Sequence, residues 1–182
     1  RLRSISFELL APLFSVPGIQ WVSLQKDGRP DEMDDLVAGR GWIDPMGDVD
    51  DFEDTAAIID QLDLVITVCT SVTHLAGGLG KKVWTLLSAY PDWRWLITRA
   101  EDSPWYPTMR LFRQSVLGDW EPVIAAVRQA LFEAAHAAGA CDAPETWTDA
   151  NPAPPKDFQV TLAETTPPIQ TRLAEPTGNR QT

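Results

Sequence analysis

The chain has 182 residues, enough for one domain of ordinary size. Hydrophobic residues make up 44% of it and charged residues 23%, so a globular domain with a real core is expected. The formal net charge of -11 argues against nucleic acid or an anionic membrane as the main partner, since both select for basic surfaces. One local phosphate site is still compatible with that charge, because helix N-termini bind anions without net positive charge.

Cysteine usage and hydropathy indicate a reduced, cytoplasmic protein. Cys69 and Cys141 form neither a disulfide framework nor a metal-binding spacing. No run approaches the roughly 20 apolar residues that span a bilayer, and no signal peptide is visible. The first residue is Arg1 rather than Met, so we expect the sequence to start at a cut or after a missing segment.

The first part of the chain predicts short elements separated by turns. Ser6 to Phe14 is typical of a short helix that ends before the Pro17-Gly18 turn. The β-branched and aromatic residues of Ile19 to Leu24 predict a strand. A short helix at Asp31 to Val37 and a brief strand at Gly41 to Ile43 are also expected.

The middle of the chain carries the clearest patterns. Phe52 to Leu62 predicts an amphipathic helix with Asp51 as its N-cap. Leu64 to Val68 is a nearly continuous apolar run, typical of a strand buried on both faces of a parallel sheet. Ser71 to Leu79 predicts a second helix, which Gly80 ends. The apolar face expected on the first helix consists of Phe52, Ala56, Ile59 and Leu62.

The remaining elements complete an α/β pattern. Val83 to Leu87 predicts another buried strand, Arg110 to Phe112 a last short one, and Asp119 to His136 a closing helix with Asp119 near its N-cap. Alternating helices and strands predict a parallel sheet flanked by helices, formed by residues 1–138. Residues 139–182 are rich in Pro, Thr and Ala, and we expect a disordered tail because they cannot bury enough surface to offset their ordering entropy.

The turn after the strand at Leu64 to Val68 is the candidate ligand site. Ligands of doubly wound sheets lie outside the carboxyl ends of the strands. A helix starting about three residues later leaves the amides of residues 70–73 pointing outward, with the positive end of the helix dipole behind them. His74 lies close enough to offer an N–H to the same anion. The hydroxyls that can cap the helix or donate to phosphate belong to Thr70, Ser71 and Thr73.

These residues also have ordinary structural interpretations. Ser and Thr are common N-caps, and a lone His such as His74 is more often a hydrogen-bonded structural residue than a ligand contact. The sequence has no Walker motif and no GxGxxG, so P-loop hydrolysis and ordinary dinucleotide binding lack support. The small residues Ala76, Gly77 and Gly78 are expected to let the helix pack close to the sheet.

Aromatic residues cluster around the motifs PDWRW and SPWYP. They can stack on a base or sugar, or they can pin an irregular loop to the domain. We favour the second interpretation for most of them and keep Asp92, Trp93 and Arg94 as candidate ligand neighbours. The cluster consists of Tyr90, Trp93, Trp95, Trp105 and Tyr106.

The run DLVITVCTSVTHLAGGLGKKVWTLL, followed by PDWRW and EDSPWYPTMRLFRQ, resembles the C-terminal part of bacterial tetratricopeptide-repeat proteins that end in a glycosyltransferase domain. That domain is similar to the family 9, heptosyltransferase-like enzymes of the GT-B fold. The opening RSISFELLAPLFSVPGIQWVSLQKD fits the same family, so the resemblance covers about residues 1–135. It implies one Rossmann-like half of a GT-B fold, which binds a nucleotide-sugar donor.

The resemblance also implies site residues. The turn of Thr70, Ser71, Val72 and His74 would hold the donor diphosphate, without a metal ion or other cofactor. Arg3 would be a basic phosphate contact. The looser assignments at the ligand edge are Gln25 and Lys26, together with Pro45 and Met46 in a loop facing the base.

Two departures from the family bear on activity. The family usually has Asp where this chain has Cys69, and a thiol orders a turn or accepts a hydrogen bond poorly. Free Cys at a buried strand end is also a common packing residue, and we favour that interpretation. A GT-B enzyme further needs an N-terminal domain for its acceptor and usually its catalytic base, and that domain is expected upstream. The competing hypotheses are a non-catalytic interaction module beside helical repeats and a simple nucleotide-binding sensor.

The acidic run before the predicted helix at Phe52 to Leu62 can suggest Ca²⁺. It lacks the central Gly and terminal Glu of an EF-hand loop, whereas acidic residues at a helix N-terminus complement the helix dipole. We therefore expect no metal site there. The run consists of Asp48, Asp50, Asp51, Glu53 and Asp54.

Overall fold

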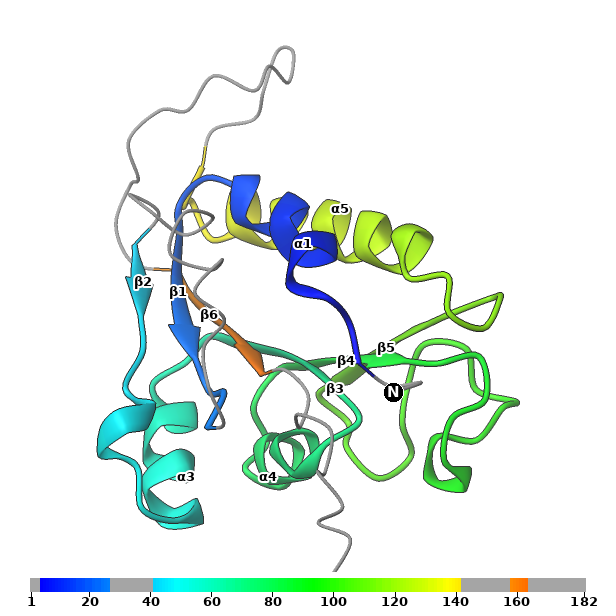
Figure 1. The fold of residues 1–182 in the computed structure, drawn as a ribbon, viewed down its shortest axis with the longest axis horizontal. Helices are drawn as coiled ribbons and strands as arrows, with labels where there is room; N and C mark the ends of the chain where they lie inside the picture. The colour runs from blue at the N-terminus through cyan, green and yellow to red at the C-terminus, as the bar shows by residue number, and fades with distance from the viewer. Residues whose placement is uncertain (1–3, 27–40, 142–157, 164–182) are drawn as a thin grey trace, which may run out of the picture.

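The computed structural model describes residues 4–26, 41–141 and 158–163. They form a six-stranded sheet in the order β2-β1-β6-β3-β4-β5, in which every pair of neighbours is parallel (Figure 1). The predicted fold class, a Rossmann-like parallel sheet flanked by helices, is confirmed. The strands are β1 (Ile19–Ser23), β2 (Trp42–Ile43), β3 (Leu64–Val68), β4 (Val83–Leu87), β5 (Met109–Arg113) and β6 (Phe158–Ala163).

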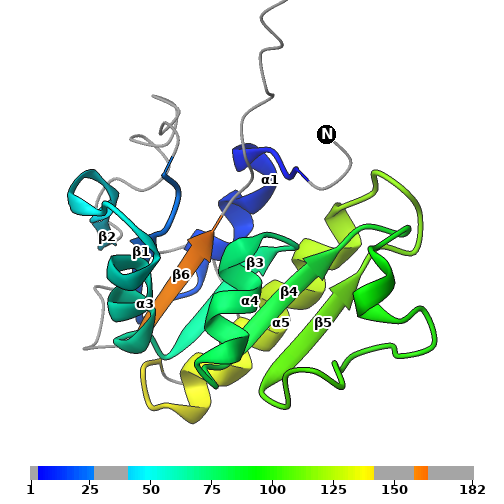
Figure 2. The same cartoon turned by 90° about the horizontal axis from the view of Figure 1, so that it is seen from below.

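Helices cover both faces of the sheet. One face carries α1 (Phe7–Leu10), the 3-10 helix η1 (Ala11–Ser15) and α5 (Glu121–Ala137), and the other carries α3 (Phe52–Asp60) and α4 (Ser71–Gly78), as Figures 1 and 2 show. Two further 3-10 helices, η2 (Met46–Asp48) and η3 (Trp93–Trp95), lie in connections.

Strand β3 explains why its sequence is apolar without alternation. Leu64, Ile66 and Val68 belong to the core cluster on the α1 and α5 face, whereas Val65 belongs to the cluster under α3 and α4. All five residues of β3 are buried. A parallel strand covered by helices on both sides needs apolar side chains in both directions, so the expected burial of this strand is confirmed.

The segment beyond Ala140 departs from the predicted tail. Ala140 and Cys141 are buried, and residues 158–163 form β6 between β1 and β3. A domain ending at residue 138 is therefore too short. Composition averages over the whole Pro-rich segment and misses a short run, FQVTLA, which pairs with two neighbouring strands and in which Val160 and Thr161 are buried. Residues 142–157 and 164–182, and the helix predicted at Asp31 to Val37, lie outside the described residues.

The predicted cap of α3 is confirmed. The Asp51 carboxylate accepts from the backbone N–H of Glu53 at 2.8 Å and of Asp54 at 3.1 Å. The Asp54 carboxylate in turn accepts from Asp50 N at 3.0 Å. These carboxylates of the acidic run therefore serve as hydrogen-bond acceptors at the start of a helix.

Two details of the helix predictions are wrong. Phe52 is 60% exposed, because the buried face of α3 runs through Thr55 and Ile59 and continues to Leu62 beyond the helix. Helix α5 begins at Glu121 rather than Asp119, and its N-cap is Trp120 without a side-chain cap bond. A proline in the first turn, Pro122, presets the backbone for the helix there.

Two apolar residues of α3, the buried Ile59 and the exposed Phe52, give a matched test of this packing. Ile59→Ala should lower the free energy of unfolding by about 2–5 kcal/mol, because Ile59 is fully buried and its loss leaves a cavity. Phe52→Ala should change it by less than about 0.5 kcal/mol. Chemical denaturation followed by tryptophan fluorescence measures both, and equal losses would contradict the packing.

Candidate functional site

The turn from β3 leads to the N-terminus of α4, which the side chain of Thr70 does not cap. Thr70 is the N-cap residue with an extended backbone (φ -128°, ψ -179°), but its side chain makes no cap hydrogen bond. Its Oγ1 lies instead 3.3 Å from Thr67 Oγ1. The first-turn amides of α4 therefore receive no hydroxyl from their own cap, and the positive end of the helix dipole adds to their attraction for an anion.

The hydroxyls around this turn divide into two kinds. Ser71 is exposed at the first position of α4. Thr73 is fully buried, and its Oγ1 donates to Val68 O at 2.8 Å. Two roles were expected for the Thr73 hydroxyl, capping the helix or donating to phosphate, and in the structure it instead donates to the end of β3 and closes the turn there. Val72 is half-buried and packs against the core cluster under α4.

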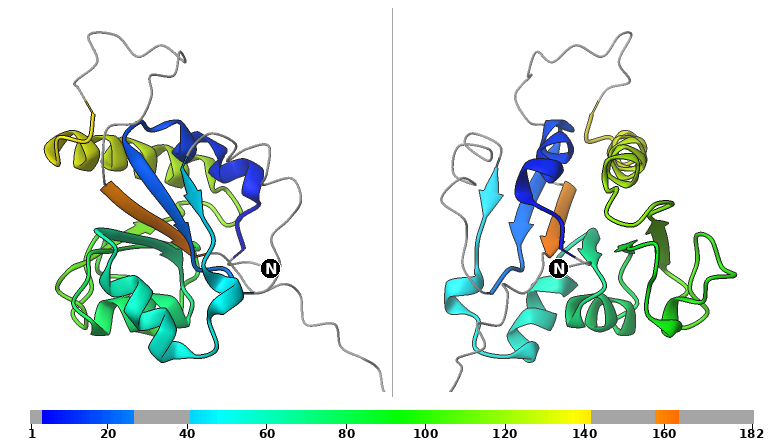
Figure 3. Two further views of the ribbon diagram at one scale, coloured as in Figure 1. Left: turned by 90° about the vertical axis from the view of Figure 1, so that its left-hand side faces the viewer. Right: turned by 45° about the vertical axis from the view of Figure 1, so that its right-hand side comes forward.

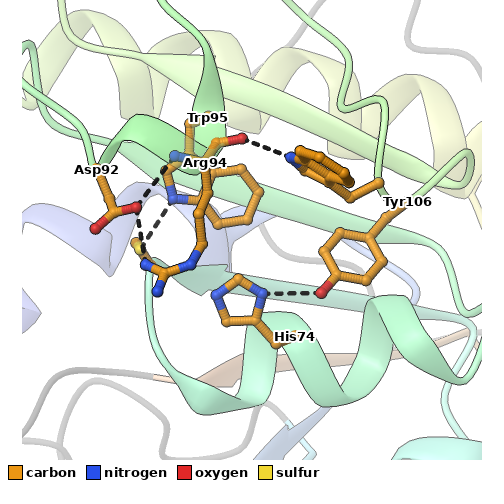
Figure 4. A network of polar contacts seen from close by, with 7 residues as sticks. His74, Asp92, Arg94, Trp95 and Tyr106 are labelled. Carbon is orange, nitrogen blue, oxygen red and sulfur yellow. Dashed lines mark hydrogen bonds and ion pairs between the residues drawn. The ribbon is translucent and has the colours of Figure 1, made fainter.

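His74 is held on two sides. Its Nδ1 lies 3.0 Å from the hydroxyl of Tyr106, and its ring stacks on Trp95 with 5.4 Å between centroids and 17° between planes (Figure 4). When the Tyr106 hydroxyl donates to Nδ1, the imidazole carries its proton on Nε2. His74 then presents an N–H donor on a ring whose orientation is fixed.

Partial burial lowers the pKa of His74 below its ordinary value of 6.5. The nearby Arg94 guanidinium lowers this pKa further, and the Asp92 carboxylate opposes the shift. These surroundings favour the neutral ring, which is the form that can accept a hydrogen bond from the Tyr106 hydroxyl at Nδ1.

Tyr106 reaches His74 by lying along α4. A Cβ at Gly77 would come within 2.7 Å of the Tyr106 ring, so the absence of a side chain there makes room for the ring. Gly77 is three residues after His74 and thus on the same face of the helix. Gly78 has open space around it, so of the two glycines only Gly77 serves close packing.

The connection from β4 to β5 holds the aromatic cluster. Trp95 is 1% exposed, and its Nε1 donates to the sulfur of Cys69 at 3.0 Å. Trp105 Nε1 donates to Arg94 O at 3.0 Å, and Arg113 Nη2 at the end of β5 donates to Trp95 O at 3.0 Å. These contacts agree with the expectation that most of the aromatic residues pin the loop.

Three residues of the motif PDWRW form an ordered group, in which Trp93 and Arg94 are exposed and Asp92 is half-buried. The Asp92 carboxylate accepts from Arg94 N at 3.1 Å and from Arg94 Nη1 at 2.8 Å. The Arg94 guanidinium lies over the Trp93 ring, 5.2 Å from its centroid. Trp93 itself is 70% exposed, so its ring is available to a ligand or partner.

A cavity of about 210 Å³ lies next to the carboxyl ends of β3 and β4. The residues with polar side chains in its lining include Cys69, Ser88, Tyr90 and Asp92. It lies beside the turn that begins α4, because Cys69 directly precedes Thr70. Cys69 lines this cavity, and its sulfur accepts the indole N–H of Trp95. The interpretation of Cys69 as a packing residue therefore has a specific partner.

The remaining predicted site residues differ in their burial and in their hydrogen-bond partners. Gln25 is half-buried just after β1. Lys26 is exposed, and its ammonium donates to Val49 O and Asp50 O, each at 3.0 Å. Met46 is buried in the core cluster with Val49, so its side chain packs inside the domain rather than facing a ligand. Arg3 lies outside the described residues.

Tyr106 and Arg113 were not predicted as site residues. Tyr106 is 32 residues from His74, so no local pattern connects the two. The motif SPWYP marked Tyr106 only as one aromatic of the cluster. Arg113 lies in a strand whose sequence gives no sign that its guanidinium binds carbonyl groups of the preceding loop.

Fold and site together define a doubly wound α/β protein with a candidate anion site at the carboxyl edge of its sheet. No family model matches the chain, and no solved structure matches it. Protein FlbA of Caulobacter vibrioides is 33% identical over 139 residues, which cover 72% of this chain and 22% of that protein. The chain therefore spans less than a quarter of this relative. Within the described ranges, no helix is long and apolar enough to cross a membrane.

The two adjacent glycines of α4 test the place of Tyr106. Gly77→Ala should lower the free energy of unfolding by about 1–3 kcal/mol, because its methyl group meets the Tyr106 ring. Gly78→Ala should leave stability unchanged or raise it by up to about 1 kcal/mol through helix propensity. Urea denaturation of the two variants measures the difference, and the packing is refuted by equal stabilities.

Titration of His74 tests its surroundings. NMR of the imidazole C–H signals against pH should give a pKa below 6.5, and Arg94→Gln should raise it, because a neighbouring positive charge is removed. The neutral ring contributes its full stability above the pKa that His74 has in the unfolded chain. This contribution is lost as the pH falls from that pKa through the lower pKa of the folded chain, since the unfolded state binds the proton more readily. A pKa that stays the same in Arg94→Gln would contradict the assigned contribution of Arg94.

Proposed function

We propose that this chain is the donor-binding half of a metal-independent GT-B glycosyltransferase, similar to the family 9, heptosyltransferase-like enzymes. Its ligand would be a nucleoside-diphosphate sugar. The observation that carries the proposal is the start of α4, where amides without a hydroxyl cap and the fixed ring of His74 lie within one helical turn. The amides are donors, His74 is a donor at Nε2 when the Tyr106 hydroxyl donates to its Nδ1, and a diphosphate offers only acceptors.

The same donors suit the chemistry of the leaving group. When the sugar leaves, negative charge develops on the diphosphate. Fixed amides at Ser71 and Val72, the helix dipole and the Nε2–H of His74 would stabilise that charge without reorganising. Tyr106 and Trp95 would act as positioning residues, because they hold the ring but do not themselves reach the ligand through the contacts described.

The cavity beside this turn would take another part of the donor. It begins at Cys69 and extends toward Asp92, which orders Arg94 and the exposed ring of Trp93. An exposed tryptophan with a guanidinium against its face offers a flat surface on which a base or sugar can stack.

Transfer of the sugar would need residues beyond this chain. The acceptor site and the catalytic base would belong to an N-terminal domain, and helical repeats would adjoin it, as the family resemblance implies. We place the protein in the cytoplasm, where nucleotide sugars are available and where the free thiols of Cys69 and Cys141 would stay reduced.

A non-catalytic interaction module is the second candidate. The observation that favours it is the bond from Trp95 Nε1 to the sulfur of Cys69. At this position the family usually carries a carboxylate, and here a thiol serves the packing of the aromatic loop. A fold retained as a scaffold tolerates such a replacement, and it would bind nucleoside diphosphates weakly or not at all.

Calorimetric titration of the chain with ADP, UDP and GDP tests the proposal. We expect one of the three to bind, with a dissociation constant that reaches the millimolar range, about -4 kcal/mol, if one half of a site acts alone. His74→Ala should weaken this binding by about 1–2 kcal/mol, the contribution of a charge-assisted hydrogen bond.

His136→Ala is the matched control, because His136 is the other of the two histidines. It lies on α5, where its Nδ1 is 3.0 Å from Cys141 O. This variant should leave the affinity unchanged. Equal affinity in His74→Ala and the unmodified chain would refute the role of His74. Absence of binding by all three nucleotides to the folded chain would favour the scaffold.

A further inference from the structure

Arg113 is a cation that lacks a carboxylate partner. It lies at the carboxyl end of β5, in register with Leu87 of β4, and its side chain is half-buried. Its Nη2 donates to Trp95 O at 3.0 Å and to Arg99 O at 3.3 Å. Its Nε and Nη1 are buried, and neither has a hydrogen-bond partner among the described residues. The ion pairs found in the same part of the chain do not include Arg113.

Stability alone does not account for a guanidinium at this position. A buried N–H without an acceptor has lost its hydrogen bond to water and gained none in return. An apolar side chain of similar length, such as that of methionine, would fill the same space without this cost. Burial lowers the pKa of the Arg113 guanidinium, which nonetheless stays charged at neutral pH. The two bonds that the guanidinium donates therefore call for a role beyond packing.

The two carbonyl groups that Arg113 binds belong to the ends of a strained turn. Within the turn, the N–H of Arg99 donates to Leu96 O at 3.0 Å. Leu96 has a φ of 38°, and within the described ranges it is the one residue other than glycine with a positive φ. Such a backbone persists only where its surroundings determine it. Leu96 and Ile97 are both exposed, so burial of their side chains does not hold the turn, whereas the hydrogen bonds from Arg113 join its two ends.

The turn begins at the residue that contacts the candidate site. Figures 2 and 3 show the connection from β4 to β5 in green, beside the edge of the sheet that β5 forms. The carbonyl of Trp95 accepts from Arg113, whereas its indole ring stacks on His74 (Figure 4) and donates to the sulfur of Cys69. A shift of the Trp95 backbone would therefore move the ring that holds His74.

We infer that Arg113 is a positioning residue of the candidate diphosphate site. By binding the carbonyl groups of Trp95 and Arg99, it sets the place of the Trp95 ring and, through that ring, the orientation of His74. The diphosphate as ligand rests on the proposed function, whereas the link from Arg113 through Trp95 to His74 is independent of it.

NMR of the His74 imidazole C–H signals tests this link without a ligand. In Arg113→Lys the positive charge remains, but the side chain ends one bond short of Nη2 and loses the fork that reaches both carbonyl groups. The signals should lose the ring-current shift that stacking on Trp95 gives them. The pKa of His74 should rise toward 6.5, because the ring becomes more exposed to water. Arg113→Met should have the same two effects.

Arg110→Lys and Arg110→Met are the matched controls. Arg110 lies on the same strand and is exposed, with its guanidinium over the Phe112 ring, 4.7 Å from the centroid. Its replacement should move neither the His74 signals nor the pKa of His74. Signals that stay in place in both Arg113 variants would overturn the inference. A pKa that rises in Arg113→Met and not in Arg113→Lys would also overturn it, because the effect would then be one of charge.

Chemical denaturation shows which of the two Arg113 variants fold. Where only one folds, the ring-current shift of the His74 signals in that variant decides. If neither folds, the inference is overturned as well, because Arg113 would then hold the domain as a whole rather than the connection from β4 to β5.

Calorimetric titration with ADP, UDP and GDP adds the effect on the ligand. Arg113→Lys should weaken the binding of the preferred nucleotide by about three-fold or more, a part of the loss expected on removing the His74 side chain. Arg110→Lys should leave the affinity unchanged. Equal affinities of the folded Arg113→Lys variant and the unmodified chain would overturn the positioning role. If none of the three nucleotides binds to the unmodified chain, the proposed function fails, and the NMR comparison still decides whether Arg113 positions His74.

Discussion

The burial of β3 on both faces is the constraint on which the rest of the molecule depends. Its alternate side chains enter two different cores, so helices must cover both sides of the sheet. This packing fixes the position of the carboxyl end of β3 in the sheet. The hydrogen bond from the Thr73 hydroxyl to Val68 O then fixes where α4 begins. The candidate anion site is a consequence of that geometry, since the first amides of α4 emerge at the carboxyl edge of the central strands.

The connection from β4 to β5, which carries the aromatic cluster, adds side-chain contacts to the start of α4 and makes the candidate site more specific. Trp95 fills a buried position and contacts both Cys69 and His74, so one side chain links the end of β3 to the first turn of α4. Tyr106 completes the arrangement from the other side, in the space that Gly77 leaves open. The imidazole is consequently oriented before any ligand arrives, and preorganised donors are what electrostatic stabilisation of a leaving diphosphate needs.

Local sequence patterns predicted much of the fold and part of the site. The apolar run of β3, the Asp51 cap and the position of the turn at Thr70 all depend on neighbouring residues, and the structure agrees with each. Phe52 was misplaced because helical spacing gives a period but not which apolar residue the sheet covers. Strand β6 was missed because its stability comes from β1 and β3, which are distant in sequence. The link between His74 and Tyr106 is hidden for the same reason.

The proposed function requires that backbone amides at the start of α4 bind a diphosphate. An NMR titration of the isotopically labelled chain, comparing a nucleoside diphosphate with its nucleoside, tests it most directly. We expect the amide signals of Ser71, Val72 and Thr73 to shift with the diphosphate and to stay in place with the nucleoside. Shifts of equal size with both ligands, or shifts confined to other parts of the sheet, would contradict it.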